Sequence, residues 1–339
     1  MYRVAVIGLG AFTDGAHLPA YSRMPELRVV AGCARSEGTR RTQGERWAIP
    51  ALYEDAHELL ERERPDLAVI CSPPDTHLPF TLAALHVGAH VYCEKPFVQS
   101  MDELEFLREA EAATGRRVMV GQNFRNYAVV QAARRLIGTP GIGALRAVSA
   151  WQYQWTTPDE EQGWRRKLLL TTERRVWYEF ANHLCDMLRF LLGADAESVY
   201  ARMPRLLPDV PGDLADFVTM EFPGGRVASV LLYRISRGKP ERLGLRLHCE
   251  DADLLIRWPH TLEVQRGDST EIVCTEQGAD ETGDTAADSV RRTMASFLTA
   301  LERGEEPPTG IRDNRETLKL VFGAYESAAT GEVVRLAGR

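Results

Sequence analysis

The chain has 339 residues, of which 44% are hydrophobic and 26% are charged. This composition is typical of folded globular proteins and excludes collagen-like, fibrous and wholly disordered classes. Lys and Arg number 41 and Asp and Glu 48, so the net charge is −7, which argues against nucleic acid and anionic membranes as partners. A single core rarely grows beyond about 250 to 300 residues, so we expect two domains.

Cysteine and lysine usage add two constraints. The six cysteines form no C-x-x-C pair, and three of them lie in apolar runs typical of buried strands, which predicts reduced thiols and a cytoplasmic protein. The first residues lack the features of a secretory signal, and no apolar run reaches the roughly 18 residues of a membrane span. Of the 41 basic residues 37 are arginine, so each of the four lysines suggests a specific role.

The first 121 residues alternate β-branched runs with helical patterns, as a parallel sheet with crossover helices requires. Helix starts are marked by two capping boxes, Asp55 with Glu58 and Ser100 with Glu103. We predict a doubly wound Rossmann sheet with strands at residues 3–8, 28–34, 66–71, 90–93 and 117–121.

The pattern changes after residue 126, where strands follow one another and predict a large, open, mainly antiparallel sheet in an α+β domain. We expect strands at residues 144–154, 198–202, 217–222, 227–235, 243–249, 253–258 and 271–274. Helices are expected at 127–137, 178–192, 287–303 and 312–329. The predicted domains are residues 1–122, which bind a dinucleotide, and residues 123–339, which bind substrate and form oligomers.

The first predicted strand ends in Gly8-Leu9-Gly10 and leads into a helix. Gly8 would allow a tight turn, and Gly10 would let backbone N–H groups approach a pyrophosphate at the helix N-terminus. Thr13 replaces the third glycine of the dinucleotide fingerprint, and a tight turn without a ligand is the alternative.

The end of the second predicted strand bears on cofactor choice. NAD sites usually place an acid there, about 20 residues after the glycines, to accept the ribose 2′-OH. Here Ala34 occupies that place and Arg35 follows. An arginine can clasp a 2′-phosphate, so we predict NADP(H), with NAD(H) possible; an accidental arginine in an arginine-rich chain is the alternative.

The segment Glu94-Lys95-Pro96 follows a predicted parallel strand, at the edge where open α/β sheets bind ligands. Lysine differs from arginine in that it can lose its proton near neutral pH when its surroundings lower its pKa. We therefore interpret Lys95 as a proton-transfer group; a surface ion pair of Glu94 with Lys95 is the alternative.

The predicted helix at 178–192 is apolar except for a stripe at i, i+3, i+4 and i+7 formed by Glu179, Asn182, His183 and Asp186. Glu179 lies one turn from His183 and could orient its imidazole for proton transfer. A face exposed to water explains the stripe equally well. No third histidine or cysteine at ligand spacing joins it, so no metal site is predicted.

Together these residues resemble the Gfo/Idh/MocA oxidoreductases. The similarity covers nearly the whole chain, from the opening VIGLGAFTDGAHLPAY through DLAVICSPPDTH at residues 66–77 to GAHVYCEKP at residues 88–96. Gly121, Asn123 and Arg125 match the segment that enters the second domain, and Trp164-Arg165 and the closing SAATGEVV extend the match.

The resemblance implies hydride exchange between a nicotinamide cofactor and a sugar or cyclitol in a homodimer or homotetramer. The catalytic residues it implies are Lys95 and His183 for the proton and Glu179 for orientation. The implied cofactor-binding residues are Gly8, Gly10, Ala11, Phe12, Thr13, Arg35, Ser36, Ser72, Pro73, His77, Glu94, Lys95 and Pro96. The implied substrate-binding residues are Lys95, Asn123, Arg125, Trp164, Arg165, Glu179, Asn182 and His183.

This sequence departs from the family pattern near the polar stripe. Glu179 replaces an aspartate, Ala181 replaces a glycine, and Glu173-Arg174-Arg175 replaces a glycine run. The two arginines could bind a substrate carboxylate or phosphate, or form a solvated turn. Two rival functions therefore stay open: a hydrolase of the same fold that retains its cofactor, and a cofactor-binding regulator without turnover.

Overall fold

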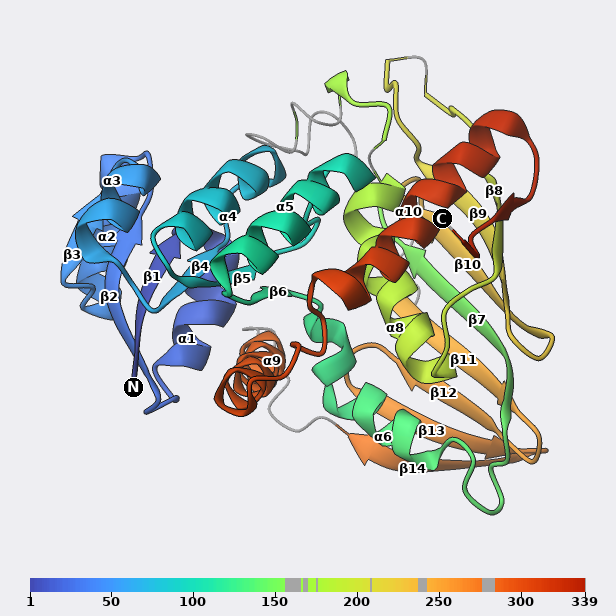
Figure 1. Ribbon diagram of the computed structural model, residues 1–339. Coiled ribbons are helices and arrows are strands. Elements are labelled where there is room, and N and C mark those ends of the chain that lie inside the picture. Colours follow the sequence, from blue (N-terminus) through green and yellow to red (C-terminus); the bar gives the residue numbers. More distant parts are fainter. Residues whose placement is uncertain are drawn as a thin grey trace. The chain divides into compact units, whose positions relative to one another are not determined.

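The computed structural model describes residues 1–155, 166, 170–174, 176–207, 209–236, 243–275 and 284–338. Two compact units divide the chain (Figure 1). The first comprises Met1–Asn126 and Asp280–Arg315, and the second comprises Tyr127–Ala279 and Glu316–Arg339. The stretch that ends at Arg315 therefore joins the first unit, whereas the sequence analysis assigned it to the second domain.

The first unit is built on a six-stranded parallel sheet with the strand order β3-β2-β1-β4-β5-β6. Its strands are β1 (Tyr2–Ile7), β2 (Leu27–Cys33), β3 (Ala51–Tyr53), β4 (Leu67–Ile70), β5 (His90–Cys93) and β6 (Val118–Val120). All four residues of β4 are buried, as expected for a parallel strand covered on both faces. The order reverses between β1 and β4, which is where such sheets bind ligands.

Helices cover both faces of this sheet, with α1 and α9 on one side and α4 and α5 on the other (Figure 1). The side-chain oxygens of Ser36, Asp55 and Ser100 each accept a hydrogen bond from a backbone N–H in the first turn of the following helix, as is typical of these residue types at a helix N-cap. The helical elements are η1 (Thr13–His17), α1 (Leu18–Tyr21), α2 (Glu37–Trp47), α3 (Ala56–Glu63), η2 (Pro74–Thr76), α4 (His77–His86), α5 (Met101–Thr114), η3 (Asn123–Asn126) and α9 (Asp284–Arg303).

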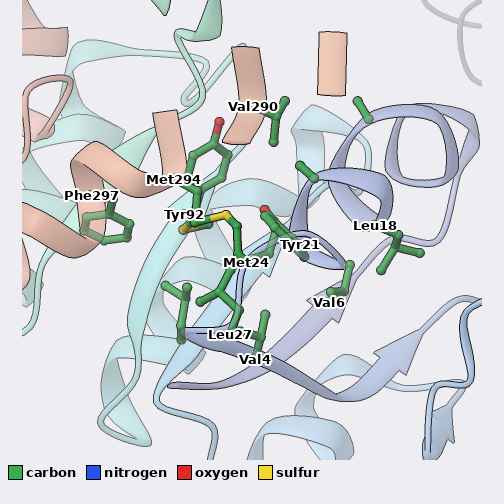
Figure 2. Packing of buried hydrophobic residues seen from close by; sticks show 14 of the residues in the cluster. Val4, Val6, Leu18, Tyr21, Met24, Leu27, Tyr92, Val290, Met294 and Phe297 are labelled. Carbon is green, nitrogen blue, oxygen red and sulfur yellow. The ribbon is translucent and has the colours of Figure 1, made fainter. Parts of the chain in front are cut away.

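A hydrophobic cluster explains why α9 belongs to the first unit. Figure 2 shows Val290, Met294 and Phe297 of α9 packed with Tyr92 of β5 and Met24. Phe297 and Met294 are fully buried. Burying a side chain of this size stabilises the fold by about 1.5–3 kcal/mol. Because α9 shares this core with Val4 and Val6 of β1, it belongs to the first unit although it lies near the end of the sequence.

The second unit contains a nine-stranded sheet with the order β14-β13-β12-β11-β7-β10-β9-β8-β15. Its strands are β7 (Leu145–Tyr153), β8 (Ser198–Arg202), β9 (Ala215–Phe222), β10 (Arg226–Tyr233), β11 (Leu243–Cys249), β12 (Asp253–Arg257), β13 (Thr261–Arg266), β14 (Ser269–Thr275) and β15 (Val334–Arg335). Only β7 and β10 pair in parallel among these described strands; the other pairs are antiparallel.

The helical elements among the described residues beside this sheet are α6 (Ala128–Leu136), η4 (Trp177–Ala181), α8 (Asn182–Leu192) and α10 (Ile311–Thr330). The helices α6, α8 and α10 lie along one face of the sheet (Figure 1). At Gly323 of α10 an added Cβ would lie 3.2 Å from Val199 of β8, so α10 packs closely against the sheet there. None of the helices in the described ranges is long and apolar enough to cross a bilayer.

The predicted fold class, a Rossmann sheet followed by a mainly antiparallel open sheet, is confirmed. Three strands were missed: β3, β13 and β15. Strands β3 and β15 have only three and two residues, too few for a periodic pattern. In β13 a charged residue, Glu263, is buried and accepts a hydrogen bond from Arg257, which hides the apolar pattern of the strand. The helix after Gly10 also differs, because its centre is the π-helical turn η1.

Candidate functional site

The turn after β1 is closed by a contact between backbones. Gly8 has φ +100°, and an added Cβ would lie 2.6 Å from the carbonyl carbon of Cys71 and from the amide nitrogen of Ser72. Only glycine fits this position, because the obstructing atoms are main chain and φ is positive. The turns that follow β1 and β4 therefore touch directly.

Thr13 occupies the place of the third fingerprint glycine. Its hydroxyl donates to the Gly8 carbonyl over 2.6 Å, so the side chain closes the turn from within. Next to it, a Cβ built on Gly10 has no atom within 4 Å, which leaves open space over the backbone at the start of the helix. Helix N-terminal N–H groups beside an open glycine fit a pyrophosphate, and exposed Ala11 and Phe12 continue this surface.

At the end of β2, Arg35 and Ser36 are exposed, and Ser36 caps α2 by accepting the Thr39 N–H. Arg40 turns back and donates to the carbonyl oxygens of Ala34 and Arg35 over 2.6 and 2.8 Å, and it also pairs with Glu54. Arg40 therefore fixes the backbone of this turn, whereas Arg35 projects from it.

The turn after β4 carries Ser72, Pro73 and His77. The His77 ring contacts two carbonyl oxygens at 2.8 Å, that of Ser72 through Nε2 and that of Pro96 through Nδ1. Burial lowers the pKa of His77, although both carbonyls favour the charged ring. His77 thus ties the turn after β4 to the turn after β5.

The turn after β5 carries Glu94, Lys95 and Pro96. Glu94 is 8% exposed; its Oε1 lies 2.9 Å from Nε2 of His17, and its Oε2 accepts the Lys95 backbone N–H over 3.3 Å. The Glu94 carboxylate is therefore buried and bonded to His17, so it does not lie on the surface as the alternative of a surface ion pair requires. Lys95 itself is half-buried.

Two residues assigned to substrate binding have structural partners within the first unit. Asn123 is 2% exposed and donates to the hydroxyl of Ser289 on α9 over 2.8 Å. Arg125 pairs with Asp313 at the start of α10 over 2.8 Å. Both contacts hold η3 in place; any contact with substrate stays a prediction.

In the second unit Glu179 lies in the π-helical turn η4 and His183 in the first turn of α8, and each is 7% exposed. The Asn182 amide donates to the Tyr178 carbonyl over 2.9 Å. Asp186 is fully buried and accepts from Thr317 of α10. The polar stripe therefore does not form a water-exposed face.

Two residues that sequence reasoning missed, Asp213 and Tyr325, hold the turn with Glu179. Asp213 accepts the Trp177 N–H over 2.6 Å and the Tyr325 hydroxyl over 3.1 Å. The Tyr325 oxygen in turn accepts the Tyr178 N–H over 3.0 Å. The N–H groups that begin this helix are thus bonded by side chains that lie 36 and 147 positions further along the chain. A local sequence pattern could not have indicated these contacts.

Asp216, on β9, is fully buried close to Asp213. Burial and the neighbouring carboxylate raise the pKa of Asp216 well above its ordinary value of 3.8. The folded protein therefore favours the protonated form of Asp216 more than the unfolded chain does.

Some predicted residues fall elsewhere. Trp164, Arg165 and Arg175 lie outside the described residues, and the guanidinium of Arg174 packs over the Tyr325 ring at 5.6 Å from its centroid. All six cysteines are described and none forms a disulfide. Within the described ranges no group of three His, Cys, Asp or Glu side chains is arranged to hold a metal ion.

Comparison with known proteins gives consistent matches. A family model described as "Oxidoreductase family, NAD-binding Rossmann fold" matches residues 2–122, and one described as "GFO/IDH/MocA C-terminal domain" matches residues 130–255. A D-apiose dehydrogenase of Paraburkholderia graminis is 26% identical over 99% of this chain and 90% of its own. A D-xylose 1-dehydrogenase (NADP(+)) 2 of Haloferax volcanii is 24% identical over 98% of both chains.

Among solved structures, a levoglucosan dehydrogenase in complex with NADH and levoglucosan superposes with a TM-score of 0.87 over 99% of both chains. At 20% identity this likeness shows a shared fold. The resemblance expected from the sequence is confirmed by the two family models.

The raised pKa of Asp216 predicts how stability depends on pH. The unfolded chain releases the Asp216 proton above about pH 3.8, whereas the folded protein retains it to higher pH. The free energy of unfolding therefore falls as the pH rises from about 3.8 toward the pKa of Asp216 in the folded protein. Asp216→Asn is expected to increase the free energy of unfolding, with a larger gain at about pH 8 than at about pH 5, in urea titrations. The exposed control Asp268→Asn should show no such trend; an equal gain at both pH values would contradict the assignment.

Proposed function

The chain belongs to the Gfo/Idh/MocA family of oxidoreductases, and from this premise we propose an NADP(H)-dependent dehydrogenase or ketoreductase that acts on a CH–OH group of a sugar, a cyclitol or a keto-sugar derivative. The observation that carries the proposal is Lys95, one of four lysines in the chain, half-buried after β5 with its backbone bonded to a buried carboxylate. The apiose, xylose and levoglucosan relatives support a carbohydrate substrate.

The first unit would hold the cofactor. The backbone from Gly8 to Thr13 would bind the pyrophosphate, and Ser72, Pro73, His77 and Pro96 would border the nicotinamide. When bound, the nicotinamide ring gives or takes the hydride. The residues of the chain bind, orient and manage the proton.

We assign the proton on the reacting hydroxyl to Lys95 and His183. In the oxidative direction the neutral amine of Lys95 takes the proton from the hydroxyl oxygen, and His183 passes it on. Glu179, four residues before His183, orients the imidazole. In this assignment the first unit binds the cofactor and the second unit binds substrate.

The role of His183 predicts that His183→Asn moves the acidic limb of the pH–rate profile.

We propose NADP(H) rather than NAD(H) because β2 ends without an acid and with an exposed arginine. Ala34 cannot accept hydrogen bonds from a ribose through its side chain, and Arg35 can donate two to a 2′-phosphate. Arg40 holds the backbone of this turn rigid, which favours a defined position for the phosphate. Among the relatives, the xylose dehydrogenase carries NADP(+) in its name, and the levoglucosan dehydrogenase was solved with NADH.

We also propose a cytoplasmic homodimer or homotetramer. Six free thiols are typical of a reducing compartment. On the nine-stranded sheet, Phe217 and Val227 are 44% and 48% exposed, and the rings of Tyr153 and Tyr233 stack at 5.3 Å between centroids. An apolar sheet face of this kind suits contact with the same face of a second copy.

The role of Lys95 predicts the outcome of two substitutions. Lys95→Met removes the amine and Lys95→Arg keeps a cation that cannot lose its proton, so both should lower kcat by about 10²–10⁴-fold. Cofactor affinity, measured by fluorescence titration, should stay nearly unchanged. The assay is a panel of sugars, cyclitols and their keto forms with NADP(H) and NAD(H) in parallel. Turnover retained in Lys95→Arg would show that the residue supplies charge alone.

The role of Arg35 predicts a change of cofactor preference. Arg35→Asp should weaken NADPH binding by about tenfold or more relative to NADH, because a carboxylate repels the 2′-phosphate. Arg41→Asp, exposed one turn along α2, is the matched control and should leave the preference unchanged. An NADPH affinity that is the same in Arg35→Asp as in the unmodified protein would refute the assignment.

The proposed assembly predicts that Val227→Glu lowers the molar mass measured by light scattering to that of a single chain, because a buried charge opposes contact between the two apolar faces. Val333→Glu, 52% exposed and outside the sheet, is the control. A single-chain mass for the unmodified protein would exclude the assembly.

A further inference from the structure

The π-helical turn η4 begins without a local cap. Its N-cap residue is Val176, whose side chain cannot accept a hydrogen bond. The first N–H groups of a helix have no partner within the helix and need one from elsewhere. Here Asp213 Oδ2 accepts the Trp177 N–H over 2.6 Å, and the Tyr325 hydroxyl oxygen accepts the Tyr178 N–H over 3.0 Å. Side chains from two distant segments of the second unit therefore replace the local cap.

The two supporting side chains are bonded to each other. The Tyr325 hydroxyl donates to Asp213 Oδ1 over 3.1 Å while it accepts from Tyr178, so the hydroxyl acts as donor and acceptor at once. The indole N–H of Trp177 donates to the Val321 carbonyl of α10 over 3.2 Å. The start of η4 is therefore fixed to α10 through its backbone and through a side chain.

Further contacts hold the two residues that flank Glu179. The Tyr178 carbonyl belongs to the peptide bond that joins Tyr178 to Glu179, and it accepts from the Asn182 amide over 2.9 Å. On the other side, the guanidinium of Arg234 lies 4.3 Å from the centroid of the Phe180 ring, a distance typical of a cation–π contact. Arg234 is itself buried. The chain is thus held immediately before and immediately after Glu179.

We propose that Asp213, Tyr325 and Arg234 are positioning residues for Glu179, which hold η4 so that the carboxylate keeps a fixed place from which it orients His183. The proposal rests on the function proposed above for Glu179 and His183. The three residues are not required to touch substrate or cofactor. Each acts on the backbone of η4 or on a side chain next to Glu179.

The shape of η4 explains why such support matters. Glu179 lies in the π-helical turn, which ends at Ala181, and His183 lies in the α-helix that follows directly. In a π-helical turn the N–H groups bind carbonyls five residues back instead of four, and such turns are rare and frequent at functional sites. A return of η4 to α-helical geometry would rotate Glu179 about the helix axis relative to His183. Support at the first two N–H groups of η4 opposes this change.

One substitution removes the support with the loss of a single atom. Tyr325→Phe keeps the ring, but the Tyr178 N–H loses its acceptor and Asp213 loses a donor. Tyr200→Phe is the matched control, because it removes the same atom from another tyrosine of the second unit, whose hydroxyl accepts from Arg202.

A double-mutant cycle separates positioning from mere stabilisation. With the best substrate of the panel, kcat/KM should fall by about 10- to 100-fold in Tyr325→Phe, because a small misplacement of a catalytic group has effects of this size. Tyr200→Phe should leave kcat/KM unchanged. In a Glu179→Ala background the Tyr325→Phe change should cost less than about twofold, since no carboxylate is left to position. A purely structural cap predicts the same factor in both backgrounds.

A second variant tests the other side of Glu179. Phe180→Leu keeps an apolar side chain but removes the ring that Arg234 contacts. It should lower kcat/KM by a smaller factor than Tyr325→Phe, and this loss should also disappear in the Glu179→Ala background. NADPH affinity, measured by fluorescence titration, should be unchanged in every variant because the proposed cofactor site lies in the first unit. Losses that persist without Glu179 in both variants overturn the proposal.

Amide hydrogen exchange gives a readout that needs no turnover. In Tyr325→Phe the Tyr178 N–H should exchange at least about tenfold faster, as measured by peptide mass spectrometry with fragmentation, whereas Tyr200→Phe should show no difference. Unchanged exchange in Tyr325→Phe overturns the inference even where substrates are turned over. If no substrate of the panel is turned over but the exchange difference persists, the proposed function fails and the hold of Tyr325 on η4 is upheld.

Discussion

The first unit depends on a row of backbone hydrogen bonds that continues past the ends of its strands. The N–H of Gly8 donates to Cys33, that of Cys71 to Ile7, that of Glu94 to Ile70 and that of Gly121 to Cys93, each over 2.8–2.9 Å. The first residues after four strands are therefore held side by side at one edge of the sheet. Because Gly8 and Gly121 lack side chains, the turn after β1 reaches the turn after β4, and the Glu94 carboxylate reaches His17.

Two sets of buried ionisable groups lie near residues that we assign to the proposed chemistry: His17 and Glu94 beside the Lys95 backbone, and Asp213 and Asp216 near the turn of Glu179. Burying a pair such as His17–Glu94 costs free energy that the attraction between the two side chains only partly offsets, and burial of Asp216 in the second unit raises its pKa. The hydrophobic cluster of α9 with β1 and β5 supplies stabilisation of the opposite sign in the same unit. Buried ionisable side chains that lower stability are typical of functional regions.

The sequence predicted the elements whose cause is local and missed those whose cause is distant. Strands β1, β2, β4 and β5 were predictable because each is a short apolar run bounded by turn residues, and the predicted caps Asp55 and Ser100 both accept the expected helix N–H. The contacts of Asp213 and Tyr325 with the turn of Glu179 were not predictable. They join residues far apart in sequence, and a single carboxylate or phenol carries no periodic signal.

Each proposed half of the active site is fixed by contacts inside its own unit. Lys95 is held through Glu94, His17 and His77, all in the first unit. The turn with Glu179 is held through Asp213 and Tyr325, both in the second. Catalytic groups need supporting contacts that restrict them to a narrow range of positions, because small displacements cost large factors in rate. The contacts named here support Lys95 from within the first unit and the turn of Glu179 from within the second.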